Sequence, residues 1–210
     1  QKTVRYHMAI NKVEKINSKI LSYGAKLLPV VKNRTNEEIK FLYDFGFRDF
    51  GENRINDYKL HYSKYKDVNY HFIAPIQSRK LLEIVKNFKY VHTIARAKEV
   101  DILEKNHEEC NYFIQINIDN DPKKSGVTTK DIYNFYEYCL IKKIFPIGIM
   151  TIPDIKSDPK KVFSEMQIIN EKLKSIYEYK GELSMGMSND YDIALDYGAT
   201  IVRIGTKLFT

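Results

Sequence analysis

The chain has 210 residues, of which 43% are hydrophobic and 13% aromatic, enough apolar material for a folded domain and unlike a disordered chain. Its net charge of +7 comes from lysines spread along the whole chain, without an arginine-rich segment or a basic and aromatic stripe, so we expect no nucleic-acid binding. We expect a cytoplasmic protein, because no apolar run is long enough to cross a membrane, the start lacks the apolar core of a secretion signal, and the two cysteines form no disulfide framework.

Helical and strand patterns alternate along the chain. Residues 9–23 repeat apolar side chains on one face of a helix, which ends at Gly24. The strands that we predict, in chain order, are 27–31, 48–52, 69–75, 90–94, 110–118, 145–150, 182–186 and 200–205. The helical segments between them are 35–46, 54–66, one that ends near Phe88, 95–107, 129–142, one that begins at Asp158, and 189–197.

Two helix starts carry specific capping signals. Thr35 followed by Glu38 is a capping box, in which each side chain can satisfy a free backbone N–H group of the first turn. Asp158 followed by Pro159 is typical of an N-cap residue and a first helical position. These signals mark the starts of two of the predicted helices.

Strands that alternate with helices predict a parallel sheet. Eight such units in about 180 residues favour a closed (β/α)₈ TIM barrel with an extra helix at its N-terminal side. An open doubly wound sheet has a similar pattern and remains the alternative. No linker, repeat or low-complexity segment interrupts the chain, so we expect residues 1–210 to form a single domain.

Polar residues follow several of the predicted strands, at the end where barrels carry their functional groups. The segment "SMGMS" (184–188) is a turn with glycine and serine before a helix, and "RIGT" (203–206) ends the last strand. Backbone N–H groups freed by glycine, together with hydroxyl groups, bind phosphate well. These two turns therefore predict an anion site, although Ser188 is equally suited to cap the helix that follows it.

Lys32 follows the first predicted strand, where a charged amine is out of place beside a buried apolar run. Either the side chain reaches along the surface to water, or it points into a pocket and acts as a nucleophile. A lysine amine, a phosphate site and a partner for a ring nitrogen, here Arg203, are what pyridoxal 5′-phosphate (PLP) requires. The second interpretation therefore predicts a PLP site.

The motifs together resemble one known family. The segments "LLPVVK", "FGEN", "HFIAPIQSRK", "VHTI", "KSG", "GIMTIP", "ELSMGMSND" and "VRIGTKLF" occur in the order and at the spacing of the pyridoxal-phosphate homeostasis proteins, over about residues 9–209. This family is similar in fold to the N-terminal barrel domain of alanine racemase. It binds PLP and is thought to carry or buffer it, without established enzymatic turnover.

The resemblance assigns a role to each matching residue. Lys32 is expected to form the internal aldimine with PLP, Asn53 of "GEN" to lie beside the cofactor, and Arg203 to face the pyridine nitrogen. The residues expected to hold the phosphate are Ser184, Ser188, Gly205 and Thr206. The sequence departs from the usual family pattern at Val31, Ala74 and Arg79, which affects the surroundings of the cofactor rather than the lysine.

The resemblance implies a protein that takes part in intracellular PLP homeostasis and holds the cofactor without efficient catalysis. Racemases of this fold use a second base from a separate domain, and this sequence has no residues left for such a domain. A small PLP-dependent racemase or lyase remains the alternative. The expected partners are PLP itself and PLP-accepting apoenzymes, with no metal ion, and the expected state is a monomer or a weak dimer.

Overall fold

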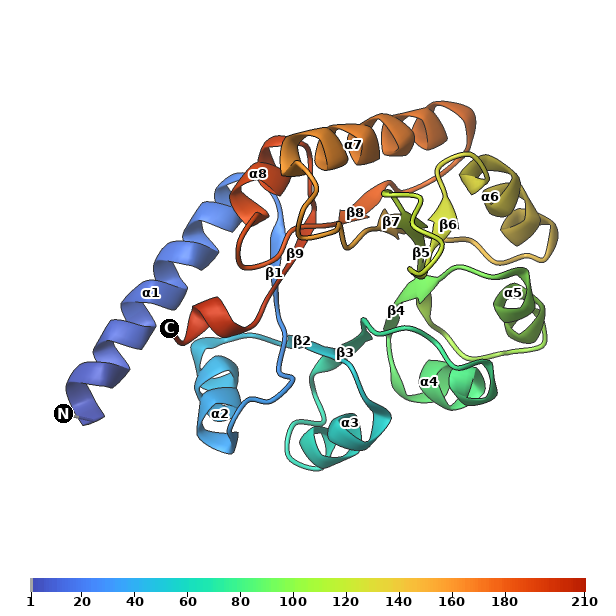
Figure 1. Cartoon of the computed structure of the whole chain (residues 1–210). Coiled ribbons are helices and arrows are strands. Elements are labelled where there is room, and N and C mark those ends of the chain that lie inside the picture. Colours follow the sequence, from blue (N-terminus) through green and yellow to red (C-terminus); the bar gives the residue numbers. More distant parts are fainter. Residues whose placement is uncertain (1) are drawn as a thin grey trace.

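The computed structural model describes the backbone of residues 2–210 and the side chains from His7 onward. Parallel strands form a ring that is surrounded by helices (Figure 1). The strands are β1 (Lys26–Pro29), β2 (Asp49–Glu52), β3 (Asn69–Phe72), β4 (Tyr90–Ile94), β5 (Asn111–Asn117), β6 (Val127–Thr128), β7 (Gly148–Met150), β8 (Glu182–Ser184) and β9 (Ile201–Ile204). The helices are α1 (Lys2–Ser22), α2 (Asn36–Phe45), α3 (Ile55–Tyr62), α4 (Leu81–Asn87), α5 (Ala97–Glu104), α6 (Ile132–Ile141), α7 (Pro159–Ile176) and α8 (Tyr191–Asp196), with short 3₁₀ turns η1 (Ser78–Lys80) and η2 (Thr206–Leu208).

The strand order β1-β9-β8-β7-β5-β4-β3-β2 places the first and second strands at the two ends of the sheet. These ends meet, because Val30 forms a parallel bridge with Gly51 and the Val31 N–H donates to the Gly51 carbonyl at 3.0 Å. Every strand pair is parallel. The prediction of a nearly closed parallel barrel is therefore confirmed, and the open doubly wound sheet is wrong.

The predicted capping signals are present at both helices. The Thr35 hydroxyl accepts from the Glu38 N–H at 3.1 Å, and the Glu38 carboxylate accepts from the Thr35 N–H at 3.0 Å. The Asp158 side chain accepts from the N–H of Lys160 at 3.1 Å at the start of α7. Both caps satisfy backbone donors that a helix leaves free at its first turn.

The predicted boundaries differ from the structure mainly at short elements. Helix α1 begins at Lys2 rather than residue 9, and most strands are one to three residues shorter than predicted. The two-residue strand β6, which pairs with Ile116 and Asn117 of β5, was not predicted. So short a segment carries too few residues for an alternating pattern to be visible.

The ring of strands has one apolar layer on its outer side and one on its inner side. The larger one fills the space between the barrel and its helices, and α1 contributes Val13, Ile16 and Ile20 to it. The smaller one lies inside the barrel and consists of Leu28, Ile73, Phe113, Met150 and Ile201, with Val30, Tyr90 and Ile147 packed against it. Within the part of the chain that is described, no helix combines the length and the apolar character that crossing a membrane requires.

Candidate functional site

The predicted site residues lie on four neighbouring strands, β8, β9, β1 and β2, at their carboxyl ends. Arg203 of β9 donates its backbone N–H to the Gly186 carbonyl at 2.9 Å, which extends the β8–β9 pairing to the turn after β8. On the other side, the Val30 N–H donates to the Ile204 carbonyl at 2.9 Å, and Val30 in turn bridges Gly51. The sequence-distant motifs are therefore consecutive around one side of the barrel mouth.

Lys32 occupies an exposed turn directly after β1. The turn is held by Asn33, which has a positive φ of 58°, and by a hydrogen bond from the Arg34 N–H to the Val31 carbonyl at 3.2 Å. Val31 is buried, so the chain leaves the barrel wall only at Lys32. None of the described carboxylates forms an ion pair with Lys32, and its amine is therefore available to a ligand.

The end of β2 combines a buried acid with a half-buried amide. Glu52 is fully buried and hydrogen-bonds to the His61 ring of α3. Burial raises the pKa of the Glu52 carboxyl, and the His61 contact opposes this effect. Asn53 follows, and its buried Oδ1 atom has no hydrogen-bond partner among the described residues. A buried acceptor without a partner is costly, and at a barrel mouth it indicates a place for a ligand donor.

The turn after β8 is shaped by Gly186, which has a φ of 99°. A Cβ atom at this position would lie 2.7 Å from the Ala194 Cβ atom of α8, so the close approach of turn and helix requires glycine. The N-cap residue of α8 is Asp190, whose carboxylate accepts from the Met187 N–H at 2.7 Å. Ser188 is thus not the helix cap, and that interpretation of this serine is wrong.

Ser188 is half-buried, and its hydroxyl has no hydrogen-bond partner in the described part of the chain. Thr206, at the start of η2, is exposed, and its hydroxyl is likewise without a partner. Gly205 lies against β1, because a Cβ atom there would meet the Val30 carbonyl at 3.3 Å. Each of the two predicted phosphate turns therefore carries a hydroxyl group without a partner among the described residues, and the turn at Gly205 lies against Val30.

Ser184 and Arg203 are in direct contact inside the barrel. The Arg203 guanidinium donates to the Ser184 Oγ atom at 2.5 Å and to the Thr151 carbonyl at 2.9 Å. Arg203 is 3% exposed, and burial lowers its pKa to about 10, which leaves it charged at neutral pH. Ser184 is fully buried, so its hydroxyl serves Arg203 in this structure. Its predicted contact with a phosphate stays a prediction.

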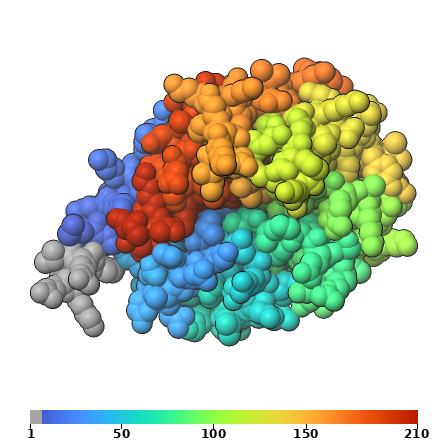
Figure 2. All heavy atoms as spheres, viewed as in Figure 1, coloured from blue at the N-terminus to red at the C-terminus, as the bar shows by residue number. Residues whose placement is uncertain are grey.

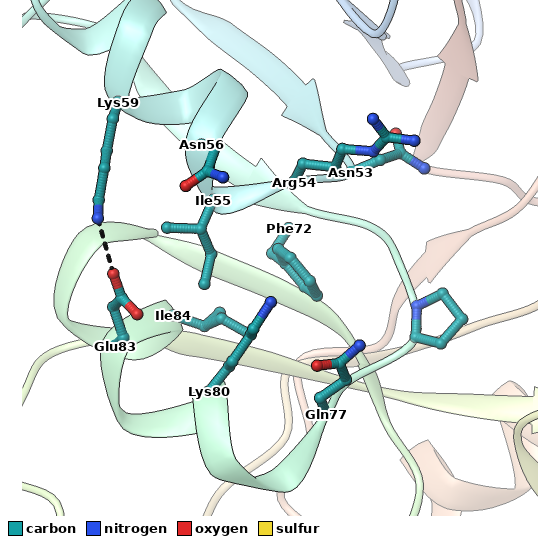
Figure 3. A pocket seen from close by; sticks show the side chains of 11 residues that line it. Asn53, Arg54, Ile55, Asn56, Lys59, Phe72, Gln77, Lys80, Glu83 and Ile84 are labelled. Atoms are coloured by element: carbon teal, nitrogen blue, oxygen red, sulfur yellow. Dashed lines mark ion pairs between the residues drawn. The ribbon is translucent and has the colours of Figure 1, made fainter.

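A pocket of about 420 Å³ opens beside Asn53, between α3 and the segment formed by η1 and α4 (Figure 3). Its lining residues are Asn53, Arg54, Ile55, Asn56, Lys59, Phe72, Pro75, Gln77, Lys80, Glu83 and Ile84. Lys59 pairs with Glu83 at 3.0 Å across its outer edge. Lys32 is not among the lining residues, so this pocket adjoins the predicted site rather than containing the lysine.

The opposite side of the mouth is closed by two loops. In Figure 2 the residues after β5, coloured yellow-green, meet the orange residues after β7 near the centre of the molecule. Lys124 joins these loops by ion pairs to Asp119 at 3.0 Å and Asp154 at 3.4 Å. A pocket of about 360 Å³ lies against them and is lined in part by Gln115, whose buried Oε1 atom has no described partner.

Sequence reasoning missed a set of buried polar side chains that lead to Arg203. The Ser184 Oγ atom lies 2.9 Å from His92 Nδ1, His92 Nε2 lies 2.9 Å from His71 Nδ1, and His71 Nε2 lies 2.9 Å from an oxygen of Asp49. A visible signal was the histidine inside each of two short apolar strands, "NYHF" and "YVHTI", at inward-facing positions.

The comparisons with known proteins agree with this architecture. No family model matches the chain. The pyridoxal phosphate homeostasis protein of Aquifex aeolicus is 32% identical over 196 residues, which cover 88% of this chain and 86% of that protein. The pyridoxal phosphate homeostasis protein of Synechocystis is 34% identical over 198 residues, which cover 89% and 91%.

Among solved structures, PipY of Synechococcus elongatus with PLP bound superposes with a TM-score of 0.82. It is 22% identical to this chain, and the match covers 96% of this chain and all of that one, which supports the same fold. The relatives are more than 30% identical over nearly the whole length, and the motifs lie together at one end of the barrel. This chain belongs to the pyridoxal phosphate homeostasis protein family.

Proposed function

We propose that this protein binds PLP at the carboxyl end of its barrel and takes part in PLP homeostasis. The observation that carries this proposal is the arrangement at the ends of β8, β9 and β1. It combines a buried cationic Arg203 with the hydroxyls of Ser188 and Thr206 and the amine of Lys32, none of which has a partner among the described residues. The name of its relatives, pyridoxal phosphate homeostasis protein, and the PLP-bound structure of PipY support the choice of ligand.

The chemical demands of PLP fit the residues present. PLP supplies an aldehyde that condenses reversibly with a primary amine, together with a dianionic phosphate and a basic ring nitrogen. Lys32 supplies the amine. We assign the phosphate to the hydroxyls of Ser188 and Thr206 and to the backbone at Gly205, because these groups have no competing partners in the described chain. The buried Oδ1 of Asn53, just after β2, has no partner among the described residues and can accept a hydrogen bond from a ligand.

Arg203 is the group that we place against the ring nitrogen. A buried guanidinium donates hydrogen bonds and keeps its own proton, so it holds a neighbouring ring nitrogen unprotonated. An unprotonated ring is a weaker electron sink than a protonated one. This choice favours storage and release over carbanion chemistry, and the protein is therefore expected to retain PLP without efficient turnover.

Release needs only the reverse of capture. Lys32 is exposed, so its amine would stay accessible to water and to an acceptor amine, which release of PLP would require. We extend the proposal to PLP-accepting apoenzymes as recipients, to a cytoplasmic monomer or weak dimer, and to residues 1–210 acting as one binding domain. A racemase or lyase activity is the competing outcome, and it would appear as amino-acid turnover by the purified protein.

The proposal is tested by titrating the purified protein with PLP and following the visible absorbance band of the lysine-bound cofactor. Lys32→Ala is expected to abolish this band while the circular dichroism spectrum stays that of a folded protein. The matched control is Lys160→Ala, which removes an exposed lysine at the start of α7 and should keep the band. A band of unchanged intensity in Lys32→Ala would refute the assignment of this lysine.

A further inference from the structure

A line of hydrogen-bonded side chains runs through the inside of the barrel. It starts at the first residue of β1 and ends at the guanidinium beneath the mouth. We call it the barrel polar chain, and its members are Lys26, Asp49, His71, His92, Ser184 and Arg203. It crosses an otherwise apolar interior, where a polar group is tolerated only when its hydrogen bonds are satisfied.

The direction of every hydrogen bond in this chain follows from its two ends. Arg203 can only donate, so the Ser184 oxygen accepts from it. At the other end, the hydrogen bonds from His71 and Lys26 outweigh burial and hold the pKa of Asp49 below its usual value, so its carboxylate only accepts. His71 must therefore carry its proton on Nε2, the atom that faces Asp49.

The two imidazoles are then fixed as well. With its proton on Nε2, neutral His71 offers Nδ1 as an acceptor, so His92 must donate from Nε2. His92 Nδ1 is left as the acceptor for the Ser184 hydroxyl proton. Burial lowers the pKa of both histidines, and the positive charge of Arg203 lowers that of His92 further, which agrees with two neutral rings.

The ring planes are held by aromatic neighbours. His71 stacks on Tyr90 with ring centres 4.1 Å apart and planes 2° from parallel, and His92 stacks on Phe113 at 4.3 Å and 17°. Turning either imidazole out of its plane breaks its stacking, and a half-turn within the plane exchanges nitrogen and carbon atoms and breaks its hydrogen bonds. The orientation of each side chain in the barrel polar chain therefore depends on that of its neighbours.

We infer that the barrel polar chain is a positioning device: Asp49, His71 and His92 fix the Ser184 hydroxyl, and Ser184 fixes the orientation in which the Arg203 guanidinium faces the cofactor ring. This inference rests on the proposed PLP site. The Thr151 carbonyl holds the second guanidinium nitrogen, so Ser184 and Thr151 together set its plane. The direction of the remaining Arg203 N–H groups is then set by these two protein contacts and does not depend on the ligand.

The first test needs no cofactor. In the protein without PLP, nitrogen NMR of ¹⁵N-labelled histidines near pH 7.5 should find His71 and His92 neutral and protonated at Nε2. In Asp49→Asn the end group can also donate, so a mixture of tautomers should appear. A charged ring, or a proton on Nδ1 of either histidine in the wild type, overturns the inference whatever the protein does with PLP.

The second test uses a pair of substitutions at His92. An asparagine places its amide near Nδ1 and can still accept from Ser184, whereas a glutamine places its amide near Nε2 and cannot. Both lose the stacking on Phe113. Titration with PLP should show that His92→Gln binds about tenfold more weakly, as expected for a disordered hydrogen bond to a charged group, with a shifted visible band. His92→Asn should recover part of both effects.

The exposed His107→Gln is the control, and it should match the wild type. Equal affinity and an identical band in the wild type and in a folded His92→Gln variant would overturn the positioning role. Failure of the wild type itself to bind PLP would overturn the proposed function and the inference together. Loss of the band in Lys32→Ala, with unchanged spectra across the His92 variants, would leave the proposed function standing and remove only the inference.

Discussion

The Arg203 guanidinium donates to the Ser184 hydroxyl at 2.5 Å, across two neighbouring strands and in full burial. This contact separates two roles that the sequence motifs had merged. Ser184 supports the arginine from within the barrel, whereas the hydroxyl of Ser188, four residues later, has no partner among the described residues. The two serines of one motif should therefore respond differently to substitution.

Ser184→Ala is expected to destabilise the folded protein. The change leaves a guanidinium N–H and the His92 Nδ1 atom without their partner inside the barrel. Loss of one partner from a buried polar pair costs about 1–3 kcal/mol. Urea denaturation near neutral pH measures this cost. A free energy of unfolding equal to that of the wild type would show that the contact contributes nothing to stability.

Ser188→Ala and Thr206→Ala are expected to act on the ligand instead. Neither hydroxyl has a partner in the described chain, so the free energy of unfolding without PLP should change by less than about 0.5 kcal/mol. Each substitution should weaken PLP binding about tenfold through one lost hydrogen bond to a charged phosphate. Equilibrium titration with PLP checks this. Unaltered affinity in the double variant would place the phosphate elsewhere.

Gly186→Ala tests the shape of the turn after β8. Both Gly186 and Gly198 have a positive φ, of 99° and 90°, but only at Gly186 would a Cβ atom lie 2.7 Å from another carbon, the Ala194 Cβ. Gly198→Ala should cost about 1 kcal/mol from backbone strain alone. Gly186→Ala should cost at least about 2 kcal/mol and weaken PLP binding, because the turn must move. Chemical denaturation compares the two, and equal costs would argue against the steric explanation.

The buried histidines predict a loss of stability in mild acid. Burial lowers the pKa of His71 and His92 below the ordinary value of 6.5 in the folded chain. Below pH 6.5 the unfolded chain binds protons that the folded chain does not. The free energy of unfolding is therefore highest above pH 6.5. As the pH drops below 6.5, it decreases by up to about 1.4 kcal/mol per pH unit for each histidine.

Denaturation curves recorded between pH 7.5 and 5 measure this slope. His92→Gln should reduce this slope by up to about 1.4 kcal/mol per pH unit, the contribution of one histidine. His107→Gln, on the surface, should leave the slope unchanged. The lowered pKa of Asp49 acts in a separate window, below its ordinary value of 3.8, and does not disturb the comparison. A slope in His92→Gln as steep as in the wild type would mean that this ring is already charged in the folded state.

The fold could be predicted because its signals are local and repeated. Alternating apolar strands and capped helices, such as the one that Thr35 begins, report the order of elements without any knowledge of contacts. Strand β6 and turn η2 were missed because they depend on pairing and closure rather than on pattern. The start of α1 was missed because its apolar face begins only near Ala9.

The site could be predicted only as far as its motifs reach. Lys32, Asn53 and Arg203 were predicted from residue type, strand position and family resemblance, and their contacts with PLP stay predictions. The contact of Arg203 with Thr151 joins residues 52 positions apart through a backbone carbonyl, which leaves no trace in residue type. The His71–His92 link was likewise invisible, because it depends on the register between the neighbouring strands β3 and β4.

The account depends most on the attachment of PLP to one lysine. The direct measurement is to load the protein with PLP, reduce the complex with borohydride so that the bond to the amine becomes permanent, and locate the modified residue by peptide mass spectrometry. The account predicts modification of the peptide that contains Lys32, at one equivalent per chain. Modification of a different lysine, with Lys32 unlabelled, would contradict it.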